Sequence, residues 1–391
     1  MNNRDSTRAL LFSTLAMSAS FVVWNLFSPL ATRIQEMYGL TTIEKSVLVA
    51  APVLLGSVLR IPMGIYTDRF GGKKTFAATM LFLIVPLLLA SAASSYGMLL
   101  LCAVLAGMGG TTFAVSLTYV SRWYSPERQG FILGLAGLGN LGVAASSFLA
   151  PILVDRYGLD ATFRILAVMI TVVAAIFVLG AKEMPKQGAV RTFRQSMSVL
   201  RHRTTWYLSI YYFLTFGGFV AFSVYLPTLL KELFDMPATE AGLRTAAFVL
   251  VATLIRPLGG WLADRIGSGK VLTIVFGGIV LSSLAIGAAL HHLTAFGLCC
   301  LVTGALLGLG NGAVFQMVPK VSSGNTGAVT GIVGAAGGVG GFFPPIVLGM
   351  IENATGTFAG GFVLLALFAC LCLTIHYAAK KMKTAGRAAA A

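Results

Sequence analysis

The chain has few charged residues, and its carboxylates are scarcer still. Asp, Glu, Lys and Arg make up 10% of the 391 residues, with 13 acidic against 28 basic side chains, whereas soluble domains carry about 25% charged residues. Every acidic residue falls in a predicted loop or at a helix end, outside the long apolar runs. This distribution argues against a soluble protein, against a carboxylate proton relay inside those runs, and against an enzyme with paired acid–base groups.

Cysteine and hydrophilic sequence are also limited. The five cysteines all lie within apolar runs and their spacing fits no metal motif, so we predict neither a metal site nor a cofactor: Cys102, Cys299, Cys300, Cys370 and Cys372. The longest hydrophilic stretch is the segment 182–205. The chain therefore has no room for an added soluble domain within its loops.

Long apolar runs fill the rest of the chain, in which 57% of residues are hydrophobic. Each run is close to the roughly 20 residues that a membrane-spanning helix needs, and too long and uniform for barrel strands. We predict an all-α membrane protein with twelve spans at 10–32, 46–66, 74–95, 98–121, 130–152, 161–181, 206–230, 243–263, 270–290, 294–318, 326–350 and 359–379.

The basic residues are concentrated on one side of the predicted membrane. With a cytoplasmic N-terminus, inner segments hold 20 Lys and Arg and outer segments hold 6. By the positive-inside rule this bias places both termini in the cytoplasm. It also accounts for the net charge of +15 without a nucleic-acid partner, because basic loops orient the chain and contact anionic lipid.

The chain repeats itself after 196 residues. The pattern G-x-x-x-D-R-x-G follows the second and the eighth apolar run, at Gly64, Asp68 and Arg69 and again at Gly260, Asp264 and Arg265. Two copies at matching places resemble the gating-loop signature of the major facilitator superfamily. We expect two six-helix bundles, residues 1–181 and 206–391, joined by a cytoplasmic linker at 182–205, with the substrate site between them. Each Asp could hold the inner ends of neighbouring helices, and releasing them would permit rocking.

Two arginines interrupt the apolar runs at the same repeat distance. Arg60 and Arg256 are each followed closely by a proline, Pro62 and Pro257, which we expect to kink the helix. A charge buried in the membrane costs several kcal/mol unless it finds a partner. Because no acidic residue lies in an apolar run, the expected partner is an anionic substrate.

Two glycine-rich strings narrow the resemblance. The fifth run contains Gly134, Gly137, Gly139, Asn140 and Gly142, and the eleventh contains Gly334, Gly337, Gly338, Gly340 and Gly341. Glycines at this density let membrane helices approach closely, and packing explains most of them. The paired strings nevertheless resemble the nitrate-signature motifs of the nitrate/nitrite porter family, closest to bacterial assimilatory nitrate transporters, which share the string GNGAVFQ at 310–316.

This resemblance implies a set of substrate-binding residues. Arg60 and Arg256 match the family's substrate arginines, Tyr212 and Phe216 its helix-7 residues, Phe113 its helix-4 Phe, and Asn140 its helix-5 Asn. It also implies a monomeric secondary transporter in the bacterial inner membrane, moving nitrate and nitrite by alternating access, with nitrate uptake as the expected direction. Nitrate/nitrite exchange and transport of another small organic anion are the alternatives.

The chemistry of these side chains suits such a substrate. Nitrate and nitrite are small, planar oxyanions, and a planar guanidinium offers parallel N–H donors to two oxygens. Phe113 and Phe216 are expected to close above and below the anion and exclude water, while Tyr212 and Asn140 donate to a remaining oxygen. Because no acidic residue lies in an apolar run, the sequence fits nitrate/nitrite exchange, which needs no proton carrier. Co-transport of a proton is still an alternative.

Overall fold

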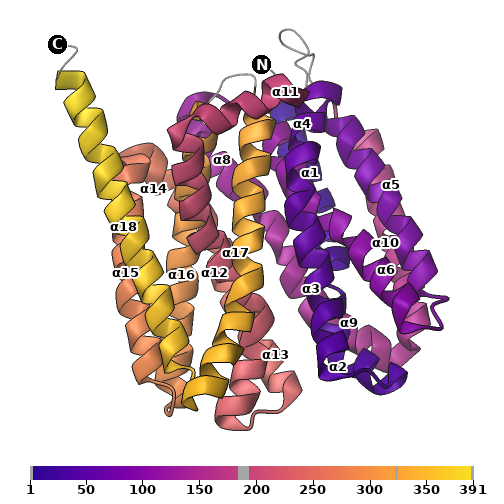
Figure 1. Cartoon of the computed structure of the whole chain (residues 1–391). Helices are drawn as coiled ribbons and strands as arrows, with labels where there is room; N and C mark the ends of the chain where they lie inside the picture. Colours follow the sequence, from indigo (N-terminus) through magenta and orange to yellow (C-terminus); the bar gives the residue numbers. More distant parts are fainter. Residues whose placement is uncertain (1–2, 184–192, 322–324, 389–391) are drawn as a thin grey trace.

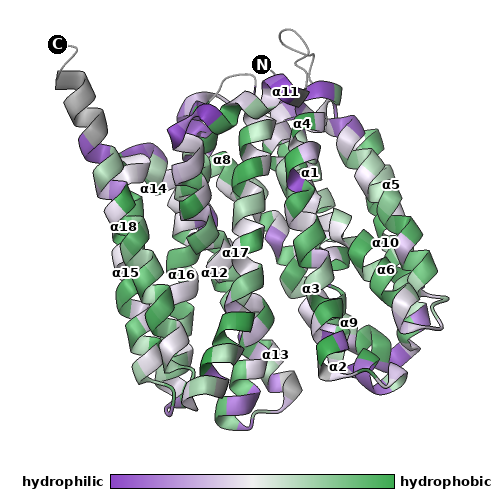
Figure 2. Cartoon of the chain, in the orientation of Figure 1, coloured by the Kyte–Doolittle hydropathy of each residue, from purple (hydrophilic) through white to green (hydrophobic). Residues whose placement is uncertain are grey.

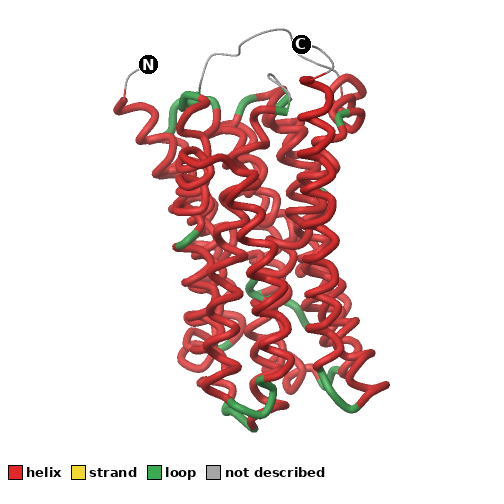
Figure 3. Tube along the Cα trace, turned by 90° about the vertical axis from the view of Figure 1, so that its left-hand side faces the viewer, coloured by secondary structure: helices red, strands yellow, loops and turns green. Residues whose placement is uncertain are grey.

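The computed structural model describes residues 3–183, 193–321 and 325–388, and within these ranges every regular element is helical. The helices run roughly parallel, and most of the loops gather at two ends of the molecule (Figure 3). The start of α1 (Asn3–Trp24) and the end of α18 (Ala359–Ala388) lie at the same end (Figure 1). We call this end the terminal face.

The first half of the described chain, residues 3–180, contains ten α-helices and three short 3₁₀ segments. In chain order, with α1, they are α2 (Phe27–Tyr38), α3 (Thr42–Val58), α4 (Arg60–Phe70), α5 (Gly72–Ala90), α6 (Tyr96–Ala106), η1 (Gly107–Thr111), α7 (Thr112–Ser121), η2 (Pro126–Arg128), α8 (Gln129–Ala136), η3 (Gly137–Asn140), α9 (Leu141–Tyr157) and α10 (Leu159–Gly180).

The second half begins with short segments at the terminal face and continues with long helices. After α11 (Phe193–Ser196) and the 3₁₀ segment η4 (Met197–Arg201) come α12 (Arg203–Phe234), α13 (Ala238–Leu254), α14 (Arg256–Leu262), the π-helical turn η5 (Ala263–Gly267), α15 (Ser268–Ala288), α16 (Leu293–Met317), η6 (Val318–Lys320) and α17 (Thr326–Thr355), followed by α18. The predicted division at 182–205 stays a prediction, and residues 184–192 lie outside the described residues.

Within the described ranges, eleven helical runs are long and apolar enough to cross a membrane. One of them, Glu240–Ala288, has 49 residues. At about 1.5 Å per residue it would be more than twice the roughly 30 Å thickness of the apolar bilayer core. It breaks at Gly267, where φ is +88°, and covers the predicted spans 243–263 and 270–290. The twelve predicted crossings are therefore confirmed, and the chain is a multi-pass membrane protein.

The outer surface of the bundle is apolar along the middle of its length. Figure 2 shows hydrophobic residues along the helices and hydrophilic residues mostly at the two ends. Leu179 and Leu281 are 87% and 71% exposed, which would be costly in water and is favourable against lipid.

The two halves contact each other through glycines at two related crossings. At the first, α4 meets α17, and a Cβ on Gly64 would overlap the main chain of Gly327. At the second, α8 meets α14, and a Cβ on Gly130 would overlap the main chain of Gly260. Glycines at both crossings bring the backbones of the halves into direct contact. The motif glycines Gly64 and Gly260 therefore have a packing role that their loop pattern did not predict.

Candidate functional site

Both predicted arginines lie at a break within a membrane helix. The helix α3 ends just before Leu59 and α4 starts at Arg60, while α13 ends just before Ile255 and α14 starts at Arg256. Pro62 and Pro257 lack the backbone N–H that would continue the helical ladder across these points. Each interruption is one residue long, at Leu59 or Ile255, and its backbone angles stay in the right-handed helical region. The kink expected from the prolines stays a prediction.

The guanidinium of Arg60 lies in the interior with 0% of the residue exposed. Its Nε–H donates to the carbonyl oxygen of Gly110 at 3.0 Å, and its Nη1 donates to the carbonyl oxygen of Gly334 at 2.7 Å. Nη2 is buried without a hydrogen-bond partner. Gly334 belongs to the second half, so this arginine is bonded to both halves of the molecule.

The guanidinium of Arg256 is equally buried, with 1% exposed. Nη2 donates to the hydroxyl of Tyr212 at 3.5 Å, the limit of a hydrogen bond, and both Nε and Nη1 are without partners. Among the described residues, neither arginine forms an ion pair with an acidic side chain. Three buried guanidinium nitrogens thus lack an acceptor, which is costly for charged donors away from water.

Aromatic side chains surround the two arginines. The Arg60 guanidinium carbon lies 5.1 Å from the ring centres of Phe113 and Phe216, and that of Arg256 lies 5.2 Å from Phe113. Tyr212 stacks on Phe216 at 4.9 Å with an interplanar angle of 8°. Arginines over aromatic faces in a desolvated site are stabilised by cation–π attraction. Five of the six predicted substrate residues therefore meet at one place.

The predicted aromatic sandwich is closed in this structure. The ring centres of Phe113 and Phe216 are 5.6 Å apart, whereas a flat ion between two rings needs about 7 Å, twice the usual contact distance. An anion between these two rings would require them to separate. The rings now pack against each other, and both guanidiniums lie at their faces.

Asn140, the sixth predicted residue, ends the 3₁₀ segment η3 and is 2% exposed. Its side-chain oxygen is buried without a hydrogen-bond partner. The same segment begins at Gly137, against which the Arg256 side chain packs. The role of Asn140 toward substrate stays a prediction.

Phe315 belongs to this aromatic cluster and was not among the predicted site residues. Its ring centre lies 4.8 Å from Tyr212, 5.2 Å from Phe113 and 5.6 Å from the Arg256 guanidinium carbon. Phe315 follows the glycines of the 310–316 string, much as Phe113 follows Gly109 and Gly110. Comparing these two runs could have identified it.

Several signature glycines make room for the arginine of the opposite half. A Cβ on Gly137 would lie 2.6 Å from Cδ of Arg256, and one on Gly334 would lie 3.3 Å from Cδ of Arg60. A Cβ on Gly338 would lie 3.3 Å from Nη1 of Arg60. Each arginine therefore lies over the glycine string of the other half, which ties the two predicted motifs together in one site.

The remaining signature glycines serve helix packing. A Cβ on Gly134 would meet Pro257 and one on Gly337 would meet the Tyr212 ring, while Gly139 and Gly142 pack on α1, and Gly340 and Gly341 pack on α12. Only helices without side chains at these points could approach so closely. This agrees with the expectation that packing explains most of the glycines.

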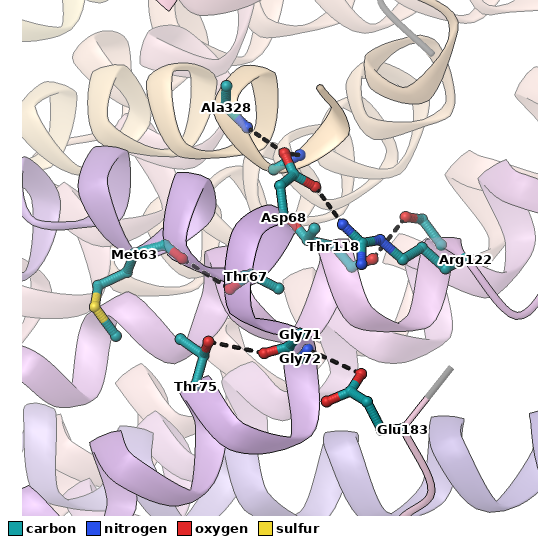
Figure 4. Close-up of polar contacts among 12 residues, drawn as sticks. Met63, Thr67, Asp68, Gly71, Gly72, Thr75, Thr118, Arg122, Glu183 and Ala328 are labelled. Atoms are coloured by element: carbon teal, nitrogen blue, oxygen red, sulfur yellow. Dashed lines mark hydrogen bonds and ion pairs between the residues drawn. The ribbon is translucent and has the colours of Figure 1, made fainter. Parts of the chain in front are cut away.

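The predicted gating-loop aspartates bind helix N-termini of the opposite half at the terminal face. Asp68 accepts from the backbone N–H of Gly327 at 2.8 Å and of Ala328 at 3.3 Å, and pairs with Arg122 at 2.6 Å (Figure 4). Asp264 accepts from the backbone N–H of Gly130 at 3.1 Å and of Phe131 at 2.9 Å. Helix N-termini favour negative charge, so each carboxylate holds the halves together.

The arginines and final glycines of the two loops also match. Arg69 lies over the Phe70 ring at 5.2 Å and Arg265 over the Trp261 ring at 4.7 Å, a placement suited to the membrane interface. The glycine that ends each motif, Gly71 or Gly267, has a φ of +97° or +88°. Residues with a Cβ rarely adopt that conformation, which explains the glycine at the end of both motifs.

A third carboxylate at the terminal face was missed by the sequence analysis. Glu183 accepts from the backbone N–H of Gly72 at 3.1 Å and of Lys73 at 2.8 Å, so the start of the predicted linker caps α5 (Figure 4). The Tyr119 hydroxyl donates to the carbonyl of the neighbouring Lys182. Glu183 lies 111 residues from Gly72, and no local pattern links such distant positions.

Known proteins resemble this arrangement in sequence and in fold. The sequence profile described as Major Facilitator Superfamily matches residues 13–345 and, in a second match, residues 208–388. The chain is 38% identical to the "Nitrite extrusion protein" of Bacillus subtilis, with 98% of each chain covered. It is 37% identical to the "Probable nitrate transporter NarT" of Staphylococcus carnosus, covering 98% of this chain and 99% of the relative.

A solved structure shares the fold at low sequence identity. The crystal structure of the human organic anion transporter MFSD10 (TETRAN) matches 95% of this chain and 99% of its own length, with a TM-score of 0.81 and 16% identity. Together with the full-length relatives, it confirms the predicted fold and the expectation of a transporter instead of an enzyme. The chain belongs to the major facilitator superfamily, and within it to the family that contains these bacterial relatives.

Proposed function

We propose that this protein transports nitrate, and with it nitrite, across a bacterial inner membrane by alternating access between its two halves. The observation that carries the proposal is the set of three buried guanidinium nitrogens without acceptors, on two arginines where the halves meet. A small planar oxyanion offers acceptors of matching geometry and charge. The printed names of the relatives, a nitrite extrusion protein and probable nitrate transporters, support this substrate class.

The direction we propose is nitrate uptake, with the terminal face in the cytoplasm. The excess of Lys and Arg in the predicted inner segments supports this orientation. In this arrangement Asp68 and Asp264 close the cytoplasmic side, because their bonds to the opposite half must break before that side opens. Arg60, Phe113 and Phe216 are 0% exposed and Arg256 is 1% exposed. The proposed substrate region is therefore enclosed in this structure.

Nitrate/nitrite exchange is the second candidate. Within the described ranges, no acidic side chain forms an ion pair with Arg60 or Arg256, so a carboxylate that would carry a proton through the site is missing. An exchanger needs no such group, because the anion itself returns the carrier. One relative is named for nitrite extrusion and others for nitrate transport, and exchange would join both activities.

Uptake into proteoliposomes tests the substrate and the mode together. We expect wild-type protein to accumulate labelled nitrate, and excess nitrite to compete, while chloride competes weakly because it lacks the planar oxygens. With no internal anion, uptake that follows an imposed pH gradient indicates proton symport. Uptake that requires internal nitrite indicates exchange. No transport of either oxyanion under any of these conditions would refute the proposal.

A further inference from the structure

The two arginines occupy related positions in the repeat but are bonded differently. Arg60 donates to two main-chain carbonyls, Gly110 in its own half and Gly334 in the opposite half, at 3.0 and 2.7 Å. Only its Nη2 remains without a partner. Most of the hydrogen-bonding capacity of Arg60 is therefore used by the protein itself.

Arg256 keeps its donors available. Among the described residues, its one polar contact is the 3.5 Å bond to the Tyr212 hydroxyl, and its Nε and Nη1 are buried and unpartnered. Charged donors buried without acceptors are costly, so an anion that reaches them gains more than one that meets donors already satisfied. The free energy available for anion binding is consequently larger at Arg256.

The polar partner of Arg256 belongs to its own half, although Phe113 and Gly137 of the first half also pack against its side chain. Tyr212 in α12 and Phe315 in α16 contact Arg256 and each other, and all three residues follow the predicted linker. An anion held by Arg256 and Tyr212 would stay bonded to the second half while the halves rotate. By contrast, the bond from Arg60 to Gly334 joins the two halves, so it must break when the halves separate at the level of the arginines.

We infer that the arginines divide the work of transport: Arg256, with Tyr212, is the main anion-binding group, and Arg60 is a positioning residue whose bond to Gly334 stabilises the enclosed arrangement. This inference rests on the proposed function and adds to it an asymmetry between the repeats. The substrate travels with the second half of the chain, and the first half closes over it through Arg60 and Phe113.

Lysine substitutions separate the two roles because they keep the charge and remove the directional donors. Nitrate binding to the purified full-length protein is measured by calorimetry, and nitrite/nitrate exchange is measured in proteoliposomes. We expect Arg256→Lys to raise the nitrate Kd about tenfold or more, as for loss of hydrogen bonds to a charged ligand. We expect Arg60→Lys to change the Kd less than about threefold while slowing exchange about tenfold. Arg244→Lys, in a surface pair with Glu240, is the matched control.

Two glycine substitutions give the same comparison with both arginines intact. A Cβ on Gly137 would displace the Arg256 guanidinium, whose Cζ lies 2.7 Å from that position, so Gly137→Ala should weaken nitrate binding. A Cβ on Gly334 would lie 3.3 Å from Cδ of Arg60, so Gly334→Ala should slow exchange with a smaller effect on Kd. If Arg60→Lys does not fold, the comparison of Gly137→Ala with Gly334→Ala tests the division of roles instead.

The outcomes distinguish this inference from the function on which it rests. If wild-type protein binds neither nitrate nor nitrite, the proposed function fails. If the wild type transports but both lysine variants lose affinity equally, or if Arg60→Lys exchanges at the wild-type rate, the division of roles is wrong. If Gly137→Ala and Gly334→Ala change the nitrate Kd equally, the division of roles is also wrong.

Discussion

The two gating loops share a sequence pattern, and the Asp of each binds a helix N-terminus of the opposite half. The loops nevertheless differ in local structure and in their other partners. Asp68 caps α17 and is also paired with Arg122 at 2.6 Å, while the end of α4 is regular α-helix. Asp264 caps α8 from within the π-helical turn η5, and it has no ion pair among the described residues. It borders a cavity of about 460 Å³ that His202 and Lys320 also line.

This difference shows what an internal repeat conserves. The repeat places a carboxylate at the end of the second and eighth predicted spans and aims it at a helix N-terminus of the other half. The partners of that carboxylate come from helices in which the two halves have diverged. Equivalent positions therefore make the same kind of contact with different additional partners, as the two central arginines also do.

The largest expected effect is the loss of the principal anion ligand. Arg256→Ala removes the charge and the unpartnered donors, so nitrate affinity should fall about a hundredfold or more, a cost of about 3 kcal/mol. Calorimetry on purified protein measures it, with Arg244→Ala as the control. Arg60→Ala should weaken binding less than this. Equal losses would mean that the halves contribute equally to the site.

The next effect concerns the glycine crossings, where the halves should behave alike. Gly64→Val and Gly260→Val each place a branched side chain against the main chain of the opposite half. Because neither crossing can then close, exchange should fall at least about tenfold in both variants. Gly97→Val is the control, because a Cβ there meets nothing within 4 Å. Normal exchange by either variant would show that its crossing is not needed.

The gating aspartates should differ in their effect on stability. Asp68→Asn leaves the half-buried Arg122 without its acid and should lower stability by about 2 kcal/mol. Asp264→Asn loses only charge-assisted bonds to backbone N–H groups and should cost about 1 kcal/mol. Thermal unfolding of both variants in the same detergent measures the difference. A larger loss in Asp264→Asn would reverse the comparison between the loops.

The smallest expected effect is at the aromatic cluster. Phe315→Leu keeps an apolar side chain but removes the ring beside Arg256, so nitrate Kd should rise only about threefold, as for loss of one cation–π contact. Phe368→Leu, which removes the ring packed on Phe213, is a matched control away from the arginines. A wild-type Kd in Phe315→Leu would remove Phe315 from the site.

Much of the fold could be predicted because local patterns determine it. Apolar runs of bilayer length predict the twelve crossings. The buried arginines are conspicuous because charge is rare in such runs. The meeting of five predicted residues at one place follows from the repeat together with the family resemblance.

The bonding within the site could not be predicted in the same way. The Arg60 bond to Gly334 joins positions 274 residues apart, and its acceptor is a backbone carbonyl that every residue possesses. Sequence carries no signal for which carbonyl a side chain reaches. The role of Glu183 was missed for the same reason, since it depends on how distant segments are placed. Phe315 was missed although its position after the glycines of the 310–316 string resembles that of Phe113.

The backbone contacts between glycines have a consequence for how the two halves meet. At Gly64 with Gly327 and at Gly130 with Gly260, main chain meets main chain, so the contact acts as a mechanical stop that no rotamer change can relax. At the terminal face the distance between the halves is then set by the polypeptide itself, because Gly327 and Gly130 are also the residues whose N–H groups bind Asp68 and Asp264. The closed position of this end is consequently fixed by rigid backbone, and side-chain adaptation has little freedom to change it.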